Sequence, residues 1–289
     1  MTFPTFLGIG AQKCGTSWLH QQLAAHPQIY VPWQRKEIHF FDDYYDRGQE
    51  WYSKFFPDDA EADAFVAIGE ITPRYLFEPS IPDRIHELIP HCQFIVLLRN
   101  PTNRLFSQYV MGVAHGDTRL GLRDFVDSNP SAFARGLYAE QLERYLRLFP
   151  FERFKILIFE EIFANPETTR SALASVAQFL HADPRGFDLS QYNRPVSEGH
   201  GPPRYLRALQ TAVRFRRWLR DRDMEWVVRA ARRLGIKKQL FGQFGSLPTL
   251  DPADRVEIDS RYRASIARLE EVIGRRLDCW NDAAEPIRS

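Results

Sequence analysis

The segment Gly10–Trp18 combines a glycine turn, a lysine and two hydroxyl side chains at the point where a strand would lead into a helix. Gly15 allows the backbone to bend tightly, and the free N–H groups of the following helical turn then point toward whatever binds there. Lys13 adds a full positive charge, and Thr16 and Ser17 add hydroxyl donors. The segment therefore predicts an anion-binding site at a helix N-terminus.

A second candidate anion site follows the most apolar run of the chain, residues 94–98. Arg99 comes directly after this run, which has the character of a parallel strand covered on both faces. Open α/β sheets bind ligands at the carboxyl ends of their strands. Ser107 lies eight residues later, in the helix expected to follow, where its hydroxyl would reach the same phosphate. A single arginine after a strand is more often an ion-pairing residue, but two anion sites at two strand tips are harder to explain that way.

The nearest alternative is the Walker A loop of ATPases and kinases, G-x-x-x-x-G-K-[ST]. Gly10 and Gly15 have the required spacing, but Thr16 occupies the position of the lysine, and the lysine of this chain stands inside the loop at position 13. Arg99 also follows the strand after which an acid that holds magnesium would be expected. A nucleoside-triphosphate-dependent kinase stays an alternative, but both segments favour a phosphate site without a metal.

Short apolar runs alternate with amphipathic segments along the chain. Strands are expected over residues 6–10, 66–69, 94–98 and 155–159, and helices over residues 16–26, 81–88, 103–113, 136–149, 167–180 and 254–274. The aromatic-rich residues 33–56 are expected to be mostly loop. Strands alternating with helices imply a parallel sheet with right-handed crossovers. The sequence thus predicts an α/β fold, a three-layer domain with a central, mainly parallel sheet, and a single domain over residues 1–289.

Composition limits the classes of function open to this chain of 289 residues. Thirty-eight basic and 37 acidic residues leave a formal net charge of +1, which argues against a nucleic-acid or membrane-surface binder, since both need clustered positive charge. The three cysteines are too few and too scattered for a disulfide framework and form no CxxC metal pair. No apolar run reaches the roughly 18 residues of a membrane-spanning helix. We expect partners other than nucleic acid or membrane.

The two anion segments together resemble the 5′-phosphosulfate loop and the 3′-phosphate motif of sulfotransferases that use 3′-phosphoadenosine-5′-phosphosulfate (PAPS). Within this family, the chain is similar to the branch that contains the heparan sulfate N- and 3-O-sulfotransferases and their bacterial relatives. Three further segments carry the likeness, namely Lys36–Asp42 (KEIHFFD), Gly69–Tyr75 (GEITPRY) and Leu269–Trp280. The resemblance implies the P-loop-like fold of sulfotransferases and 3′-phosphoadenosine 5′-phosphate (PAP) as the product of PAPS.

The resemblance also implies how the donor is held. Lys13 would contact the oxygen that bridges sulfate and phosphate, where leaving-group charge grows during in-line transfer, and would so stabilise the transition state. Arg99 and Ser107 would hold the 3′-phosphate. The residues that would hold the 5′-phosphate are Cys14, Gly15, Thr16, Ser17 and Trp18.

The catalytic residues implied by the resemblance lie in the segment Lys36–Asp42. Glu37 would take the proton from the acceptor as the acceptor attacks. His39, two residues later and on the same side of an extended segment, would orient the acceptor or share the proton transfer. Without the resemblance, Glu37 is an ordinary surface acid and His39 is equally well a structural histidine. Phe40 and Phe41 are expected in the core.

Two features depart from the pattern of the heparan-type enzymes. These enzymes have a lysine after the glutamate that corresponds to Glu70, and Ile71 stands in its place here, so Arg74 is a candidate to compensate. The Lys-Gly-Arg loop that grips the nucleotide late in those chains is also missing. Candidate substitutes for that loop are Asn193, Arg194 and Arg204. These differences weaken the case for a heparan substrate more than the case for PAPS.

The sequence therefore predicts a sulfotransferase that moves a sulfuryl group from PAPS to a hydroxyl or amine without a metal ion. The branch favours a carbohydrate or a glycosylated small-molecule natural product as acceptor, while lipid, polyketide and phenolic hydroxyls stay open because acceptor-facing loops differ most among such enzymes. A non-catalytic nucleotide-binding protein of the same fold is a second alternative, against which Lys13 and Glu37 argue. By analogy with the branch, whose Golgi members usually carry a transmembrane stem, a chain without an anchor is expected to be cytoplasmic.

Overall fold

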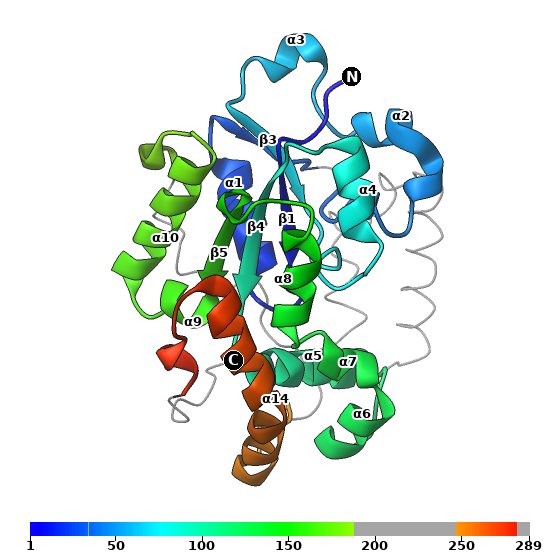
Figure 1. Ribbon diagram of the computed structural model, residues 1–289, viewed down its shortest axis with the longest axis vertical. Coiled ribbons are helices and arrows are strands. Elements are labelled where there is room, and N and C mark those ends of the chain that lie inside the picture. The colour runs from blue at the N-terminus through cyan, green and yellow to red at the C-terminus, as the bar shows by residue number, and fades with distance from the viewer. Residues whose placement is uncertain (34, 188–246, 282–289) are drawn as a thin grey trace, which may run out of the picture.

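Figure 1 shows the computed structural model of the protein, which describes residues 1–33, 35–187 and 247–281. These residues form a five-stranded sheet in the order β2-β3-β1-β4-β5, in which all neighbouring strands are parallel. The strands are β1 (Phe6–Gly10), β2 (Ile29–Tyr30), β3 (Ala67–Ile71), β4 (Gln93–Leu98) and β5 (Phe154–Ile158). The prediction of an α/β fold with a central, mainly parallel sheet is confirmed, whereas the single domain over residues 1–289 stays a prediction.

Helices flank the sheet on both faces, with α4 and α8 on the side toward the viewer and α1 behind it (Figure 1). The helices are α1 (Thr16–Ala25), α2 (Gly48–Ser53), α3 (Asp59–Ala62), α4 (Ile81–Leu88), α5 (Pro101–His115), α6 (Leu122–Ser128), α7 (Pro130–Ala134), α8 (Tyr138–Leu146), α9 (Phe159–Ile162), α10 (Pro166–Phe179) and α14 (Pro252–Ile273). The helices predicted from periodicity are present, with ends shifted by a few residues.

The middle of the sheet is buried on both faces, as its continuous apolar runs predict. Every residue of β1 is buried, as are all residues of β4 except the first. Gly8 in β1 leaves no room for a side chain, because a Cβ there would lie 2.7 Å from Cγ1 of Ile71 on the neighbouring strand β3. Ile71 therefore fills the core between these strands and is 1% exposed.

A second hydrophobic cluster lies beyond the ends of β4 and β5, where α5, α6, α7 and α14 pack together (Figure 1). Tyr262 of α14 is fully buried in this cluster, stacks on the ring of Phe133 and donates a hydrogen bond of 2.7 Å to the Phe133 carbonyl oxygen. Thr102 of α5 donates a further bond of 2.5 Å to Asp259 of α14. These contacts fix α5, the helix that follows Arg99, against the C-terminal helix.

The sequence patterns did not predict β2 or the short helices α2, α3, α6, α7 and α9. β2 has only two residues, which is too short for an apolar pattern to reveal. The short helices have between four and seven residues and depend on local caps and packing. The carboxylate of Asp58, for example, accepts hydrogen bonds from the first-turn N–H groups of α3.

Because the strands are parallel, their carboxyl ends lie at one edge of the sheet, which we call the carboxyl edge. β1 lies between β3 and β4 in the sheet, so the segments that follow these three strands are neighbours. They begin at Ala11, Thr72 and Arg99 respectively. The topology thus brings the two anion segments predicted from the sequence to adjacent strand ends.

Candidate active site

Gly15 gives the turn before α1 its shape. It is the N-cap of α1 with a φ of 91°, in the left-handed region that glycine adopts most easily. A Cβ at this position would also lie 3.2 Å from the ring of Phe159. The first turn of α1 carries no acidic side chain, and the N-cap supplies no side-chain hydrogen bond. The N–H groups of this turn are therefore suited to an anion, which the helix dipole also favours.

The residues of this turn do not all present their side chains to the same place. Cys14 is buried, its thiol lies 3.7 Å from the hydroxyl of Tyr138, and burial raises its pKa to about 11. Thr16 is also buried, and the buried ring of Trp18 packs edge-on against the exposed Phe163. Cys14 would therefore meet an anion only through its backbone N–H.

Lys13 is held inside the loop, with a φ of 71°. Its ammonium donates to the sulfur of Met111, a weak acceptor, over 3.5 Å. No carboxylate pairs with it among the residues that the structure describes. Burial lowers the pKa of Lys13, and the positive charges of Arg99 and Lys36 lower it further. A negatively charged group bound here would relieve that repulsion.

Arg99 lies directly beside this loop. Its Nη1 donates to the carbonyl oxygen of Lys13 over 3.4 Å, and its guanidinium lies 4.4 Å from the centre of the Phe159 ring. The side chain is 9% exposed, and its buried Nε has no hydrogen-bond partner in the described part of the chain. Burial lowers the pKa of Arg99. A buried guanidinium with an unused donor fits the phosphate of a nucleotide, since unpaired buried donors are costly.

The helix α5 carries the other residues of the second anion segment. Ser107 lies half-buried on this helix, but its hydroxyl makes no hydrogen bond with any described residue, so its role toward a 3′-phosphate stays a prediction. Arg104 is fully buried on the same helix and donates to Gln108 over 2.8 Å and to the carbonyl oxygen of Ala132. Its charge adds to the positive potential around Lys13.

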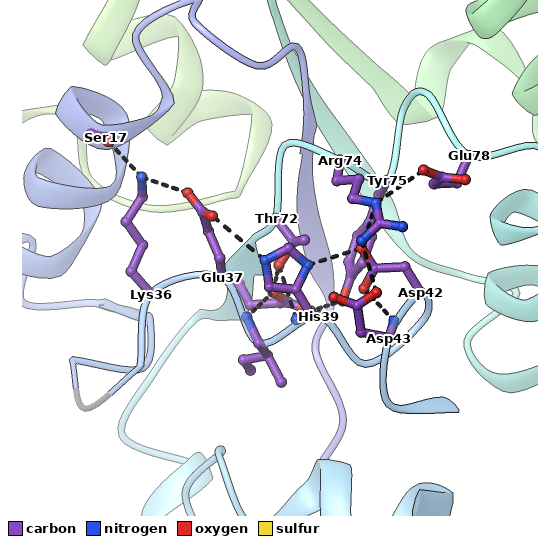
Figure 2. Close-up of polar contacts among 12 residues, drawn as sticks. Ser17, Lys36, Glu37, His39, Asp42, Asp43, Thr72, Arg74, Tyr75 and Glu78 are labelled. Atoms are coloured by element: carbon purple, nitrogen blue, oxygen red, sulfur yellow. Dashed lines mark hydrogen bonds and ion pairs between the residues drawn. The ribbon is translucent and has the colours of Figure 1, made fainter. Parts of the chain in front are cut away.

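A chain of polar contacts leads to Glu37 from the predicted anion-binding segment Gly10–Trp18, which we call the anion loop (Figure 2). The ammonium of Lys36 donates to the hydroxyl of Ser17 over 2.5 Å and to Oε1 of Glu37 over 3.0 Å. The other carboxylate oxygen of Glu37 lies 3.6 Å from Nε2 of His39. Glu37 is thus placed between two cations, Lys36 and His39. Lys36 also contacts Ser17, the second residue of α1.

The chain continues from His39 to a group of acids and one arginine (Figure 2). Nδ1 of His39 lies 2.9 Å from Oδ2 of Asp42. Nε of Arg74 lies 3.6 Å from the same oxygen, and Arg74 also pairs with Asp43 at 2.7 Å and Glu78 at 2.9 Å. Ligand atoms of His39, Asp42 and Asp43 lie within 4.8 Å of one another. The guanidinium of Arg74 supplies positive charge to these acids.

The contacts shift the pKa values of the glutamate–histidine pair in opposite directions. Burial alone would raise the pKa of Glu37, but the hydrogen bonds and charges of His39 and Lys36 outweigh it and lower the pKa to about 2. Burial alone would lower the pKa of His39, but Asp42 and Glu37 outweigh it and raise the pKa to about 9. At neutral pH the pair is therefore a carboxylate beside an imidazolium.

The backbone of this segment is held in an unusual conformation. Glu37 has a φ of 63° and His39 a φ of 62°. Left-handed backbone costs a non-glycine residue on the order of 1–3 kcal/mol and persists only where the surroundings enforce it. Here the N–H of Ile38 donates to Glu70 over 3.4 Å, and the N–H of His39 donates to the hydroxyl of Thr72 over 3.5 Å. Side chains at the end of β3 thus enforce the geometry of the glutamate and histidine.

Glu70 is the centre of this support. It is 1% exposed, and burial raises its pKa, although its hydrogen-bond donors oppose that shift. Its carboxylate accepts hydrogen bonds from the hydroxyls of Tyr52 (3.1 Å), Thr72 (2.6 Å) and Tyr75 (2.8 Å). Tyr75 in turn accepts from the N–H of Phe41 over 3.3 Å. Phe40 and Phe41 lie in the core, as predicted.

We expect Glu70→Gln to destabilise the protein by about 1–3 kcal/mol, because the amide nitrogen cannot accept a hydrogen bond and leaves at least one buried hydroxyl without an acceptor. Urea denaturation followed by tryptophan fluorescence would measure the change. The exposed Glu152→Gln serves as a matched control and should leave the midpoint unchanged. Equal stability of the two variants would show that the Glu70 carboxylate does not support this segment.

The profile of the sulfotransferase domain matches residues 4–190, which include both anion segments and the glutamate–histidine pair. The chain belongs to the sulfotransferase family. It is therefore an enzyme of a family that generally uses PAPS as its sulfate donor. The two anion segments that resembled its donor-binding motifs are the same segments that meet at the carboxyl edge.

Several sulfotransferases of known name are similar to the chain. Heparan sulfate glucosamine 3-O-sulfotransferase 6 of Mus musculus is 34% identical over 175 residues, which cover 57% of this chain and 49% of that protein. The bifunctional heparan sulfate N-deacetylase/N-sulfotransferase of Drosophila melanogaster is 32% identical over 197 residues, which cover 57% of this chain and 18% of that protein. The chain spans about half the length, or less, of these curated relatives.

A solved sulfotransferase structure shares the whole architecture. The crystal structure of a sulfotransferase from Alicyclobacillus acidocaldarius aligns with a TM-score of 0.69 and 25% identity, and covers 97% of this chain and 100% of that one. The predicted P-loop-like sulfotransferase fold is thereby confirmed. The resemblance stated from sequence motifs to the heparan sulfate sulfotransferases is confirmed by the relatives named above.

The prediction of a cytoplasmic enzyme is wrong. Besides the heparan sulfate sulfotransferases, the relatives include the membrane-associated sulfotransferase kil1 of Dictyostelium discoideum, which is 38% identical over 109 residues covering 38% of this chain and 23% of that protein. The prediction rested on the lack of an apolar span, and this sulfotransferase chain corresponds to only part of its relatives. In the described residues, no helix has the length and apolar character needed to cross a membrane.

The structure places some of the residues at which this sulfotransferase departs from the heparan-type pattern. Ile71 faces the core beside Gly8, and Arg74 pairs with Asp42, Asp43 and Glu78 rather than with the anion loop. The guanidinium of Arg74 thus lies beside Asp42, on the side of the Glu37–His39 pair that faces away from the anion loop. The candidate nucleotide-gripping residues Asn193, Arg194 and Arg204 lie outside the described residues.

No role for Lys36 followed from the sequence, although it stands next to Glu37 in the segment Lys36–Asp42. A lysine beside a glutamate on a surface loop is common, and the sequence holds no sign that its ammonium turns toward Ser17. Tyr52 and Glu70 were missed for a similar reason, since only the fold shows that they meet. A glutamate inside an otherwise apolar strand was the one available signal, because a carboxylate is rarely buried without hydrogen-bond partners.

Proposed function

We propose that the protein transfers a sulfuryl group from PAPS to a hydroxyl or amine of a carbohydrate or glycosylated small molecule. One observation carries the proposal. The ammonium of Lys36 bridges Ser17 of the anion loop and the carboxylate of Glu37, so a basic group stands beside the place where the donor's sulfate would lie. A sulfotransferase needs such a base next to its donor to accept the proton of the attacking group.

The two anion segments would hold the two ends of the donor. The N-terminus of α1 would bind the 5′-phosphosulfate, and Arg99 would bind the 3′-phosphate. The contact between Nη1 of Arg99 and the carbonyl oxygen of Lys13 supports a single ligand that spans both segments. Ser107 completes the predicted 3′-phosphate site.

The chemistry would proceed by in-line transfer. The oxygen or nitrogen of the acceptor attacks the sulfur and forms a new S–O or S–N bond, while the bond from sulfur to the bridging oxygen breaks and its electron pair stays on the 5′-phosphate of PAP. Lys13 would stabilise the charge that grows on this oxygen. Glu37 would receive the proton that the acceptor loses. His39 would hold Glu37 in position and is itself held by Asp42.

The acceptor class is supported by the relatives, several of which are named for heparan sulfate. The acceptor would approach Glu37 from the side opposite the anion loop, near the aromatic segment of residues 33–56. The substitution by Ile71 and the pairing of Arg74 with acids leave this side less cationic than a highly sulfated polymer would require. We therefore include glycosylated small molecules with the carbohydrates.

We expect isothermal titration calorimetry to show that PAP binds and that Arg99→Met lowers the affinity for PAP by roughly 10- to 150-fold. This factor corresponds to about 1.5–3 kcal/mol, the contribution of hydrogen bonds to a charged group. The affinity for AMP, which lacks the 3′-phosphate, should change much less. Arg123→Met, an exposed arginine on α6, is the matched control.

The same titration separates the kinase alternative. Tighter binding of ATP with magnesium than of PAP would support a kinase and overturn the proposal. A non-catalytic nucleotide-binding protein would bind PAP but fail to transfer labelled sulfate from PAPS to any acceptor in a panel of carbohydrates, phenols and lipids. Transfer of label that requires Glu37 would exclude it.

A further inference from the structure

Lys36 stands between the loop that would hold the donor and the carboxylate that would act as base (Figure 2). Its Nζ lies 2.5 Å from Oγ of Ser17 and 3.0 Å from Oε1 of Glu37. Its side chain is 29% exposed, so the ammonium is partly shielded from water and its charge acts more strongly than on an open surface. A cation in this position would be within reach of the group that is transferred.

The charges around Lys36 favour a second partner. Lys36 and Arg99 both repel the ammonium of Lys13, and among the described residues no carboxylate pairs with Lys13. Glu37 is shared between Lys36 and His39, so one carboxylate faces two cations. The space between Lys13, Ser17 and Lys36 therefore carries a net positive charge, and a multiply charged anion bound there would attract Lys36 in competition with Glu37.

We propose that Lys36 is a further catalytic residue, which moves from Glu37 to the sulfuryl oxygens of the donor when the donor binds. The inference rests on the proposed function. In-line transfer places the sulfur between the leaving oxygen beside Lys13 and the acceptor oxygen beside Glu37. The ammonium of Lys36 already touches a residue on each side of this line, so a short movement of its flexible side chain would bring it to the sulfuryl oxygens.

The movement would serve the reaction in two ways. The sulfuryl oxygens would exchange their hydration for a fixed cation as the S–O bond to the 5′-phosphate breaks and the bond to the acceptor forms. At the same time Oε1 of Glu37 would lose its ion pair and become free to take the acceptor's proton. The base would then be available only when the donor is present.

The test compares Lys36→Met with the wild-type enzyme in three measurements. We expect the affinity for PAP, which has no sulfuryl group, to stay within about threefold, and the affinity for PAPS to fall by at least about tenfold. The rate of transfer should fall by about 10²–10³-fold, as for the loss of one charge-stabilising donor. Lys54→Met, an exposed lysine beyond α2, is the matched control and should leave all three unchanged.

A second variant restores the charge without relying on the methionine protein alone. Lys36→Cys alkylated with 2-bromoethylamine carries a thioether analogue of lysine and should recover at least about a tenth of the wild-type rate. Wild-type enzyme treated in parallel controls for Cys279, whereas Cys14 and Cys92 are buried.

Three outcomes overturn the inference. A wild-type rate in Lys36→Met would show that the ammonium takes no part in transfer. Equal weakening of PAP and PAPS would show that Lys36 only maintains the structure of the loop. No transfer from PAPS by the wild-type protein would overturn the proposed function and this inference with it, whereas either of the first two outcomes, found beside wild-type transfer, would overturn the inference alone.

Discussion

Glu37→Gln is expected to lower the rate of sulfuryl transfer by about 10²–10⁴-fold, the usual contribution of a positioned general base. Glutamine keeps the shape of the side chain but cannot take up the acceptor's proton. The affinity for PAP should stay within about threefold, because Lys36 stands between Glu37 and Ser17 of the donor loop. Transfer of labelled sulfate and titration with PAP would measure the two effects.

The matched control for this variant is Glu87→Gln, which changes an exposed carboxylate on α4 that accepts a hydrogen bond from Tyr45. It should transfer sulfate at the wild-type rate. A Glu37→Gln protein that binds PAP and also keeps the wild-type rate would remove Glu37 from the mechanism. Loss of PAP binding in Glu37→Gln would mean instead that the carboxylate shapes the donor site through Lys36.

The pKa shifts give this prediction a dependence on pH. Between about pH 2 and pH 9 the pair is a carboxylate beside an imidazolium, and such a carboxylate is a weak base. As the pH rises through about 9, His39 loses its proton and the pair can accept one more readily. We expect kcat/KM of the wild-type enzyme to rise with pH toward about 9, and a flat profile over this range would contradict the ion pair.

Lys13→Met is expected to lower the rate of transfer by about 10²–10³-fold, since the ammonium would neutralise the charge that develops on the leaving oxygen. The affinity for PAP should fall by a smaller factor than the rate, because charge on this oxygen is greatest in the transition state. Single-turnover measurements with PAPS would separate the chemical step from product release.

The matched control for Lys13 is Lys155→Met, which removes a half-buried lysine on β5. A Lys13→Met protein with wild-type single-turnover rates would exclude the lysine from the chemical step. We do not expect a change of acceptor to restore the transfer rate of Lys13→Met, because the same bond to the 5′-phosphate breaks with every acceptor.

The features that the sequence predicted are those that depend on neighbouring residues. Gly15 and the apolar run before Arg99 each act within one strand–loop–helix unit, so spacing alone indicated two anion sites at strand ends. Their proximity followed from the general rule that parallel strands end at one edge of a sheet. The structure adds the contact between Arg99 and Lys13 that makes this proximity concrete.

The features that the sequence did not predict join residues that are far apart in the chain. Glu70 supports Ile38 across 32 positions, and the hydroxyl of Tyr52 reaches Glu70 from a segment that the sequence describes only as aromatic. The left-handed backbone at Glu37 was also hidden, since glutamate has no preference for it. Such conformations are imposed by tertiary contacts and cannot be derived from local propensity.

The packing of α14 bears on where this protein can be cut. The match to the sulfotransferase domain ends at residue 190, which suggests a truncated protein that ends there. Such a version would lose Ile258 and Tyr262, whose side chains fill the cluster beneath Leu105 and Phe106 of α5. The helix α5 would then expose its apolar face to water. The boundary read from family similarity is therefore shorter than the unit that must fold together.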